Sequence, residues 1–218
     1  MKDVGYYFKQ YLSQYINKNS EILEIGCGHQ SFGSEYYKIA KRRVGIDPDN
    51  QALVRNKIIN EKICCRIDNM PDSMDKFDVV IAQWVMEHLE YPKKDISVIS
   101  NLCKTGGYFI FMTTNIYSPL MLISKILPTR IKKLARKILL DVDDNDTYPT
   151  RYRINSTIRI DKYLSDAGFK KIELRLIGAP TYFSWCKPLM KLNILFNKII
   201  GNKLPFLTHI VGIYKKVA

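Results

Sequence analysis

A short acidic and glycine-rich stretch, Glu24-Ile25-Gly26-Cys27-Gly28, is the first part of the sequence whose residue types suggest chemistry. Glycines at the end of a strand let the backbone approach a ligand at the N-terminus of the following helix. Asp47 follows Gly26 by 21 residues, a distance at which a carboxylate accepts from both hydroxyls of a ribose. A third carboxylate, Asp68, can accept from an adenine amino group. These residues together predict a site for a cofactor that contains adenosine.

The glycine spacing argues against a dinucleotide as that cofactor. The dinucleotide-binding turn has the pattern G-x-G-x-x-G, and Ser31 stands at the position of the third glycine. Close packing of a pyrophosphate is therefore not supported. A plain strand-to-helix turn stays open as an alternative for Gly26 and Gly28, because glycines also serve turns that bind no ligand.

The elements that must position these residues alternate in type along residues 1–114. An amphipathic helix is predicted first, and strands then alternate with helical segments. The predicted strands are 21–25, 44–47, 63–67, 77–82 and 108–113. This alternation predicts an α/β fold with a parallel sheet and helices on both faces. Right-handed crossovers place the loops that follow the strands along one edge, where ligands bind in open α/β sheets.

Further elements are predicted after residue 154. A helix begins at Asn155 or Ser156 as N-cap and stops at Gly168, and strands are expected over 170–177 and 209–214.

Residues 115–154 are predicted to be an insertion into this domain. Apolar stripes at helical spacing alternate there with Lys and Arg, which predicts a basic helical lid over the substrate site. Residues 1–114 and 155–218 form the domain that carries it, and residues 179–205 are expected to add a cover.

The charge is divided unevenly along the chain. Residues 115–218 hold 19 Lys and Arg against 7 Asp and Glu, and residues 1–114 hold 15 against 14. Nearly all of the net charge of +13 therefore belongs to the second half. Such an asymmetry predicts a negatively charged partner on that side of the molecule.

Five stretches of the sequence together resemble the class I S-adenosylmethionine-dependent methyltransferases, in particular the subgroup that acts on small molecules and lipids. The stretches that carry the resemblance are 21–28, 44–49, 67–71, 77–92 (FDVVIAQWVMEHLEYP) and 102–112 (LCKTGGYFIFM). The resemblance implies a doubly wound, mostly parallel seven-stranded sheet of the Rossmann-like methyltransferase type, with the last strand antiparallel. It also implies S-adenosyl-L-methionine as cofactor and S-adenosyl-L-homocysteine as product.

The resemblance assigns roles to individual residues. Gly26 and Gly28 would line the methionine part of the cofactor, Asp47 would hold the ribose, and Asp68 the adenine amino group. The other cofactor-binding residues that it implies are Glu24, Cys27, Pro48, Asn69, Met70 and Gln83, with Glu24 orienting the loop and Gln83 beside the sulfonium. The sequence departs from the family at Gln30, which stands where a third glycine is usual. A degenerate member that binds the cofactor poorly, or has no activity, is therefore an alternative.

Methyl transfer from a sulfonium is an in-line displacement, so the protein mainly aligns the reacting atoms. A general base helps only if the acceptor starts protonated. His88 follows the fourth predicted strand, and its free pKa near neutrality makes it the candidate base. The alternative is that His88 caps a helix or orients a loop. No metal site is expected, because no further His or carboxylate is spaced to complete one with Glu87 and His88.

The acceptor is predicted to be a small or lipid- or glycan-linked molecule that is methylated on an oxygen or nitrogen. Motifs that the sequence lacks argue against a nucleic-acid base. The tetrapeptide Ala82-Gln83-Trp84-Val85 stands where base-amino methyltransferases carry a Pro-Pro-Tyr type motif. Tyr148, Arg151 and Tyr152 are predicted to bind the acceptor, which is expected to be anionic. Methylation of RNA is an alternative, because basic side chains also bind RNA phosphates.

The predicted location is cytoplasmic, with peripheral attachment at the inner face of a membrane. Six cations lie in residues 125–137 without an acidic residue among them, and each cation near an anionic bilayer contributes about 1 kcal/mol. An ordinary lid whose charges face water is the alternative. The apolar runs are too short for a spanning helix, and the N-terminus lacks the apolar stretch of a signal peptide. Five cysteines without a C-x-x-C pair favour a reducing compartment.

Overall fold

Seven strands form one sheet in a computed structural model of the chain, which describes residues 2–71, 74–118, 149–179, 187–188, 190–191, 194–195 and 205–217. The strand order is β3-β2-β1-β4-β5-β7-β6. The strands are β1 (Glu21–Ile25), β2 (Arg42–Asp47), β3 (Glu61–Cys64), β4 (Phe77–Gln83), β5 (Cys103–Thr114), β6 (Phe169–Ile177) and β7 (His209–Lys216). β7 runs antiparallel to both of its neighbours, and the pairs from β3 to β5 are parallel. The predicted mostly parallel, seven-stranded sheet is thus confirmed.

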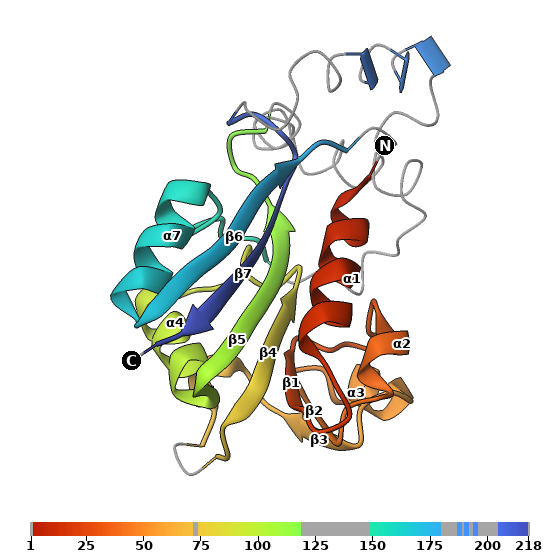
Figure 1. Ribbon diagram of the computed structural model, residues 1–218, viewed down its shortest axis with the longest axis vertical. Coiled ribbons are helices and arrows are strands. Elements are labelled where there is room, and N and C mark those ends of the chain that lie inside the picture. Colours follow the sequence, from red (N-terminus) through yellow and green to blue (C-terminus); the bar gives the residue numbers. More distant parts are fainter. Residues whose placement is uncertain are drawn as a thin grey trace.

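Helices cover both faces of the sheet (Figure 1). They are α1 (Val4–Tyr15), α2 (Ser34–Tyr37), α3 (Asn50–Arg55), α4 (Pro92–Leu102) and α7 (Thr157–Asp166). Alternate residues of β1 pack against the helices on opposite faces of the sheet, because successive side chains of a strand point to opposite faces. Ile22 packs into the cluster that contains α1, whereas Leu23 packs into the cluster that contains α4 and α7.

The third strand differs from the prediction. The pattern placed it over 63–67, but β3 ends at Cys64 and residues Ile67–Asn69 form a 3-10 helix, η1. β3 lies at the edge of the sheet, and most of its residues are exposed, so apolar residues do not mark its bounds. Backbone bonds from Asn69 to Arg66 and from Met70 to Ile67 close the 3-10 turn.

The fifth strand begins earlier than predicted. β5 starts at Cys103 and runs through Gly106 and Gly107, whereas the predicted strand begins only at residue 108. The pairing of β4 with β5 shifts register between Phe77 and Val79, and Gly106 has a φ of +87°. The glycines therefore accommodate a bulge within one strand instead of ending it.

The helix predicted after residue 154 is confirmed as α7. The Ser156 hydroxyl caps it by accepting from the Arg159 amide at 3.4 Å, and Gly168 ends it at a φ of +82°. Of the predicted lid, 115–154, residues 119–148 lie outside the described residues, and so does most of the predicted cover over 179–205.

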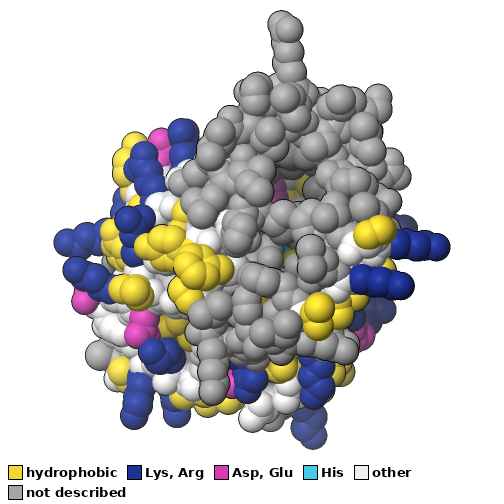
Figure 2. Space-filling view, turned by 90° about the horizontal axis from the view of Figure 1, so that it is seen from above, with side chains coloured by type: hydrophobic (Ala, Val, Ile, Leu, Met, Phe, Trp, Pro, Cys, Tyr) yellow, Lys and Arg dark blue, Asp and Glu magenta, His cyan; other side chains and the backbone are white. Residues whose placement is uncertain are grey.

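The carboxyl ends of the parallel strands point toward the top of Figure 1, and Figure 2 looks down on that edge. Lys and Arg side chains are spread around the rim of this view, with hydrophobic side chains between them. Among the helices of the described residues, none is both long and apolar enough to cross a bilayer.

Candidate functional site

The loop after β1 is shaped by two glycines with left-handed backbone. Gly26 has a φ of +66° and Gly28 a φ of +49°. A Cβ added to Gly26 would lie 2.5 Å from Val85 Cγ2, whereas one added to Gly28 would meet nothing within 4 Å. Gly26 is therefore required by the fold itself, and Gly28 leaves open space beside the backbone. This open backbone is where a ligand can approach the loop.

Asp47 ends β2 and holds the loop by its side chain. One carboxylate oxygen accepts from the Gly28 amide at 2.9 Å, and the other accepts from the Asp49 amide at 2.9 Å. The side chain is buried. Each carboxylate oxygen can accept two hydrogen bonds, so both oxygens keep an acceptor position. Asp47 is thus oriented by the protein and still able to receive hydroxyl donors.

Asn56 also holds this loop, and it was not predicted from the sequence. Its side-chain amide donates to the carbonyl oxygens of Cys27 and Gly28 at 3.1 Å each. Its side-chain oxygen accepts from the amides of Ile58 and Ile59. Because Asn56 is buried and fully engaged, it holds the loop without touching a ligand. No sequence signal marked it, because its role comes from contacts with a loop that is distant in the chain.

Glu24 lies at the centre of a buried polar cluster behind the loop. Its carboxyl group accepts from the hydroxyls of Ser31 and Tyr37 and from the side-chain amide of Gln83. Burial raises the pKa of Glu24 to about 8, against the opposing effect of these hydrogen bonds. The structure thus brings together Glu24 and Gln83, two of the predicted cofactor residues. Ser31, which excluded a dinucleotide fingerprint, belongs to the same cluster.

The residues predicted to surround the adenine lie near the ends of β2 and β3. Asp68 is partly buried on η1 and pairs with the Arg66 guanidinium at 3.1 Å. Asn69 is exposed, and Met70 is half-buried with its sulfur 3.2 Å from the Cys65 thiol. The exposed Pro48 accepts at its carbonyl from the Cys64 thiol at 3.6 Å. The predicted strand end at Asp68 is therefore corrected to a 3-10 turn.

The turn after β4 carries a residue that the sequence did not single out, Trp84. Its φ is +55°, a conformation that costs a residue with a Cβ roughly 1–2 kcal/mol. Its amide donates to the Met112 carbonyl at 3.0 Å. The residue is 36% exposed, and its indole ring contacts the His209 ring edge-on, with centroids 5.1 Å apart. A positive φ cannot be foreseen for a tryptophan, so no sequence signal could have identified it.

His88 lies in the same turn and is oriented by the chain that follows the predicted lid. Its Nδ1 lies 3.1 Å from the Pro149 carbonyl oxygen. A carbonyl only accepts, so Nδ1 carries the proton and the neutral ring has its lone pair on Nε2. Burial lowers the pKa of His88 below its ordinary value. The ring is thus kept neutral, as a base requires, and the same contact also suits a residue that orients a loop.

Glu87 joins the turn to the segment after the predicted lid. Its backbone carbonyl accepts from the amides of Arg151 and Tyr152 at 2.7 and 3.0 Å. Its buried side chain accepts from the Thr113 hydroxyl at 2.7 Å, which in turn accepts from the Asn155 amide at 2.7 Å. Burial raises the pKa of Glu87 to about 7.

Two of the three predicted acceptor-binding residues are therefore placed beside His88. Arg151 and Tyr152 are held against the turn by the Glu87 carbonyl, and the Arg151 guanidinium lies 3.7 Å from Glu90. Tyr148 lies outside the described residues.

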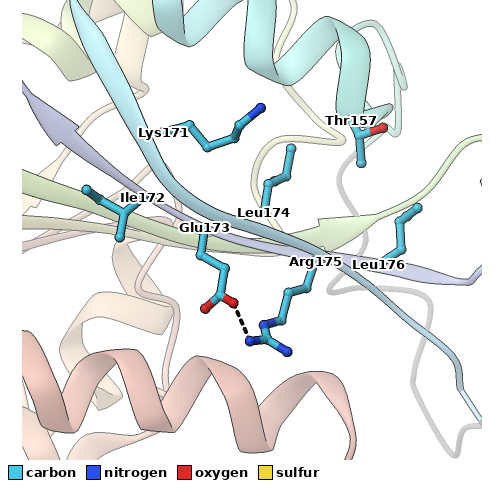
Figure 3. Close-up of a pocket in the computed structure, with 7 residues that line it drawn as sticks. All are labelled: Thr157, Lys171, Ile172, Glu173, Leu174, Arg175 and Leu176. Carbon is cyan, nitrogen blue, oxygen red and sulfur yellow. Dashed lines mark ion pairs between the residues drawn. The ribbon is translucent and has the colours of Figure 1, made fainter. Parts of the chain in front are cut away.

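A hollow also borders the sheet edge at β6, away from these residues (Figure 3). It is lined by Thr157, Lys171, Ile172, Glu173, Leu174, Arg175 and Leu176. Glu173 pairs with Arg175 and accepts from the Tyr11 hydroxyl at 2.6 Å. Three strands separate β6 from β1 in the sheet, so this hollow is not part of the site at the glycine loop. No group of three His, Cys, Asp or Glu side chains in the described ranges is placed to hold a metal.

Comparison with known proteins places the chain among methyltransferases. The profile of a family described as "Methyltransferase domain" matches residues 7–174. The ubiquinone biosynthesis O-methyltransferase of Mus musculus is 27% identical over 106 residues, which are 44% of this chain and 29% of that protein. The tRNA U34 carboxymethyltransferase of Cellvibrio japonicus is 26% identical over 109 residues, 44% of this chain and 31% of that protein. The match thus spans about a third of the length of these relatives.

Solved structures share the fold along nearly the whole chain. An S-adenosylmethionine-dependent methyltransferase of Mesorhizobium loti superposes with a TM-score of 0.61 at 12% identity, covering 97% of each chain. A geranyl diphosphate C-methyltransferase of Streptomyces coelicolor, solved with Mg²⁺, geranyl diphosphate and S-adenosyl-L-homocysteine, also gives 0.61 at 12% identity and covers 96% of this chain and 76% of that one. At this identity the superpositions establish the fold.

Proposed function

The chain belongs to the class I S-adenosylmethionine-dependent methyltransferases, and we propose that it transfers a methyl group to an oxygen or nitrogen of a small or lipid- or glycan-linked acceptor. Membership confirms the predicted family and its cofactor, S-adenosyl-L-methionine. The acceptor is the part that the proposal adds.

The acceptor part of the proposal is supported by the contact of His88 Nδ1 with the Pro149 carbonyl oxygen, beside Arg151 and Tyr152. The cofactor part is supported by the contact of Asp47 with the Gly28 amide. It places a buried carboxylate with spare acceptor positions beside backbone that has open space next to it. A ribose needs such a carboxylate, and the methionine part of the cofactor needs such a backbone.

The cluster around Glu24 fits the same cofactor by charge. The carboxyl group is buried, and its pKa of about 8 leaves it largely protonated at neutral pH. A positively charged ligand near Gln83 would favour the ionised form, because an opposite charge stabilises a carboxylate. When bound, the cofactor supplies an electrophilic methyl group on a sulfonium.

The chain's own residues would then orient the acceptor and take up its proton. Asp47, Asp68 and Gln83 would hold the cofactor, and positioning of this kind contributes up to about 7–11 kcal/mol to lowering a barrier. His88, neutral and with its lone pair on Nε2, would accept the proton from an acceptor hydroxyl, an effect of about 10²–10⁴-fold. Arg151 and Tyr152, held beside it, would contact the acceptor.

Calorimetry with S-adenosyl-L-homocysteine tests the cofactor assignment. We expect Asp47→Ala to weaken binding at least tenfold, because the ribose acceptor and the tie to Gly28 are both lost. Asp166→Ala, at an exposed carboxylate that ends α7, is the matched control and should bind as the wild type does. Equal affinity of the wild type and Asp47→Ala would exclude this role for Asp47.

RNA is the second candidate acceptor, favoured by the basic second half and by the match to a tRNA-modifying enzyme. An RNA substrate would give an affinity that falls steeply with salt, with a slope of several units on logarithmic axes. A small acceptor would give a nearly flat dependence. A chain that binds the cofactor and methylates no acceptor would instead support the degenerate alternative that Gln30 raised.

Peripheral attachment to an anionic membrane also belongs to the proposal. It rests on the six cations in residues 125–137, which lie outside the described residues. Sedimentation with anionic liposomes at low salt should pellet the protein and release it at high salt. Absence of binding at low salt would contradict membrane attachment and support the alternative, a lid whose charges face water.

A further inference from the structure

Trp84 lies between Gln83, which contacts the end of β1, and Val85, which contacts the glycine loop. Gln83 donates to Glu24 behind the loop, and the Val85 side chain occupies the space in which a Cβ on Gly26 would stand. Trp84 is therefore at the carboxyl edge of β4, directly beside the glycine turn. The methyl group must be delivered near this point if the proposed function holds.

The backbone of Trp84 is fixed in an unusual conformation. Its φ of +55° is an outlier for a bulky side chain, and its amide is fixed to Met112 in β5. Strained conformations of this kind persist where the surrounding structure over-determines them, and they cluster at functional sites. A glycine would take the same turn without strain, so the tryptophan side chain itself calls for an explanation.

The indole ring of Trp84 contacts one other aromatic ring of the described residues, that of His209. The His209 ring meets it at 68°, with centroids 5.1 Å apart. His209 begins β7 opposite Thr114 of β5, and burial lowers its pKa to about 4, so it is neutral at physiological pH. One side of the indole thus rests on a neutral ring, while 36% of the residue stays exposed.

We propose that Trp84, backed by His209, forms a stacking wall of the acceptor site, and that the acceptor carries a planar unsaturated ring next to the atom that is methylated. This inference rests on the proposed function and narrows its substrate class. The face of an indole attracts flat π-systems in offset or edge-on contact, beyond the area that is buried. A saturated ring offers no such contact and cannot lie as close to the wall.

The probe pair is catechol and cis-cyclohexane-1,2-diol, which share two neighbouring hydroxyls and differ in the π-face. The sequence has two tryptophans, Trp84 and Trp185, so quenching of fluorescence in a Trp185→Phe background reports on Trp84 alone. Titrations with and without S-adenosyl-L-homocysteine give the affinity for each probe. The variants, which lack this reporter, are titrated by calorimetry.

We expect the wild type to prefer catechol by about tenfold, in line with the energy of aromatic contacts. Trp84→Leu and Trp84→Gly should reduce the preference to near unity, and Trp84→Phe should keep most of it. The glycine variant removes the ring without straining the turn, so it separates loss of stacking from loss of fold. Tyr91→Leu, at an aromatic that is 55% exposed before α4, is the matched control and should leave the preference unchanged.

An unchanged catechol preference in Trp84→Leu and Trp84→Gly would overturn the inference, and so would a wild type without preference. Failure of the proposed function gives a different result, namely no binding of S-adenosyl-L-homocysteine by any variant. Because the ring probes are also titrated alone, the two failures are told apart.

Discussion

The buried Glu24 carboxyl makes stability fall with rising pH, and the size of the effect follows from its pKa. Burial raises that pKa from an ordinary value of 4.5 to about 8. Between these values the folded protein holds a proton that the unfolded chain has lost, so the free energy of unfolding decreases as the pH rises. At about 1.4 kcal/mol for each pH unit, the total is about 5 kcal/mol, complete above pH 8.

Glu24→Gln should remove this dependence. Glutamine copies the protonated acid, because its amide can donate to Ser31 while its carbonyl accepts from Tyr37 and Gln83. The difference in unfolding free energy between variant and wild type should therefore grow in favour of the variant from pH 5 to pH 9. Urea unfolding at one-unit pH intervals measures it. Glu87 also loses stability as the pH rises, since its pKa is raised to about 7, but it is present in both proteins and cancels.

The control is Glu35→Gln, at an exposed carboxylate whose pKa is lowered by Lys9. Its contribution is lost only in acid, so its curve should parallel the wild type between pH 6 and pH 9. If Glu24→Gln also runs parallel over that range, Glu24 is ionised throughout and the argument from burial is wrong.

Three further predictions concern the loop and the base. Gly26→Ala should destabilise the protein by about 2–4 kcal/mol in urea unfolding, because strain and a clash add, whereas Gly28→Ala should cost only about 1 kcal/mol; equal costs would contradict the packing described. Asn56→Ala should weaken binding of S-adenosyl-L-homocysteine in calorimetry by releasing the loop carbonyls, and an unchanged affinity would show that the loop holds itself. His88→Ala should lower kcat more than tenfold. In the wild type, kcat should fall with decreasing pH only below pH 6.5, where His88 becomes protonated; a near-native rate in the variant would make His88 structural.

The succession of strands along the chain and the carboxylate that ends β2 could be predicted from the sequence, because the central strands are buried on both faces. β1 and β4 are rich in apolar residues and buried over most of their length, a pattern typical of central strands in a parallel sheet. β3 lies at the edge, where burial places no demand on its residues, and its end was misplaced for that reason. Gly106 and Gly107 lie at the bulge in β5. From sequence alone such glycines suggest that a strand is interrupted, and only the pairing with β4 shows that it continues.

Asn56 and Trp84 could not be predicted, for a related reason. The role of Asn56 comes from carbonyl groups 28 and 29 residues earlier in the chain, and that of Trp84 from a backbone angle and a ring at position 209. Sequence spacing reports on neighbours within one element. It carries no information on which polar side chain will meet a backbone group of another.

The turn after β4 is the joint between the two halves of the candidate site. On one side, Val85 packs against Gly26 of the loop, and Gln83 donates to Glu24 in the strand before it. On the other, the Glu87 carbonyl and His88 hold residues 149–152. Both sets of contacts come from one short segment, so a shift of the turn changes the cofactor loop and the acceptor side together. The segment that follows the predicted lid is attached to this same turn by the contact of Pro149 with His88. Ordering of that segment would therefore also orient His88, the proposed base.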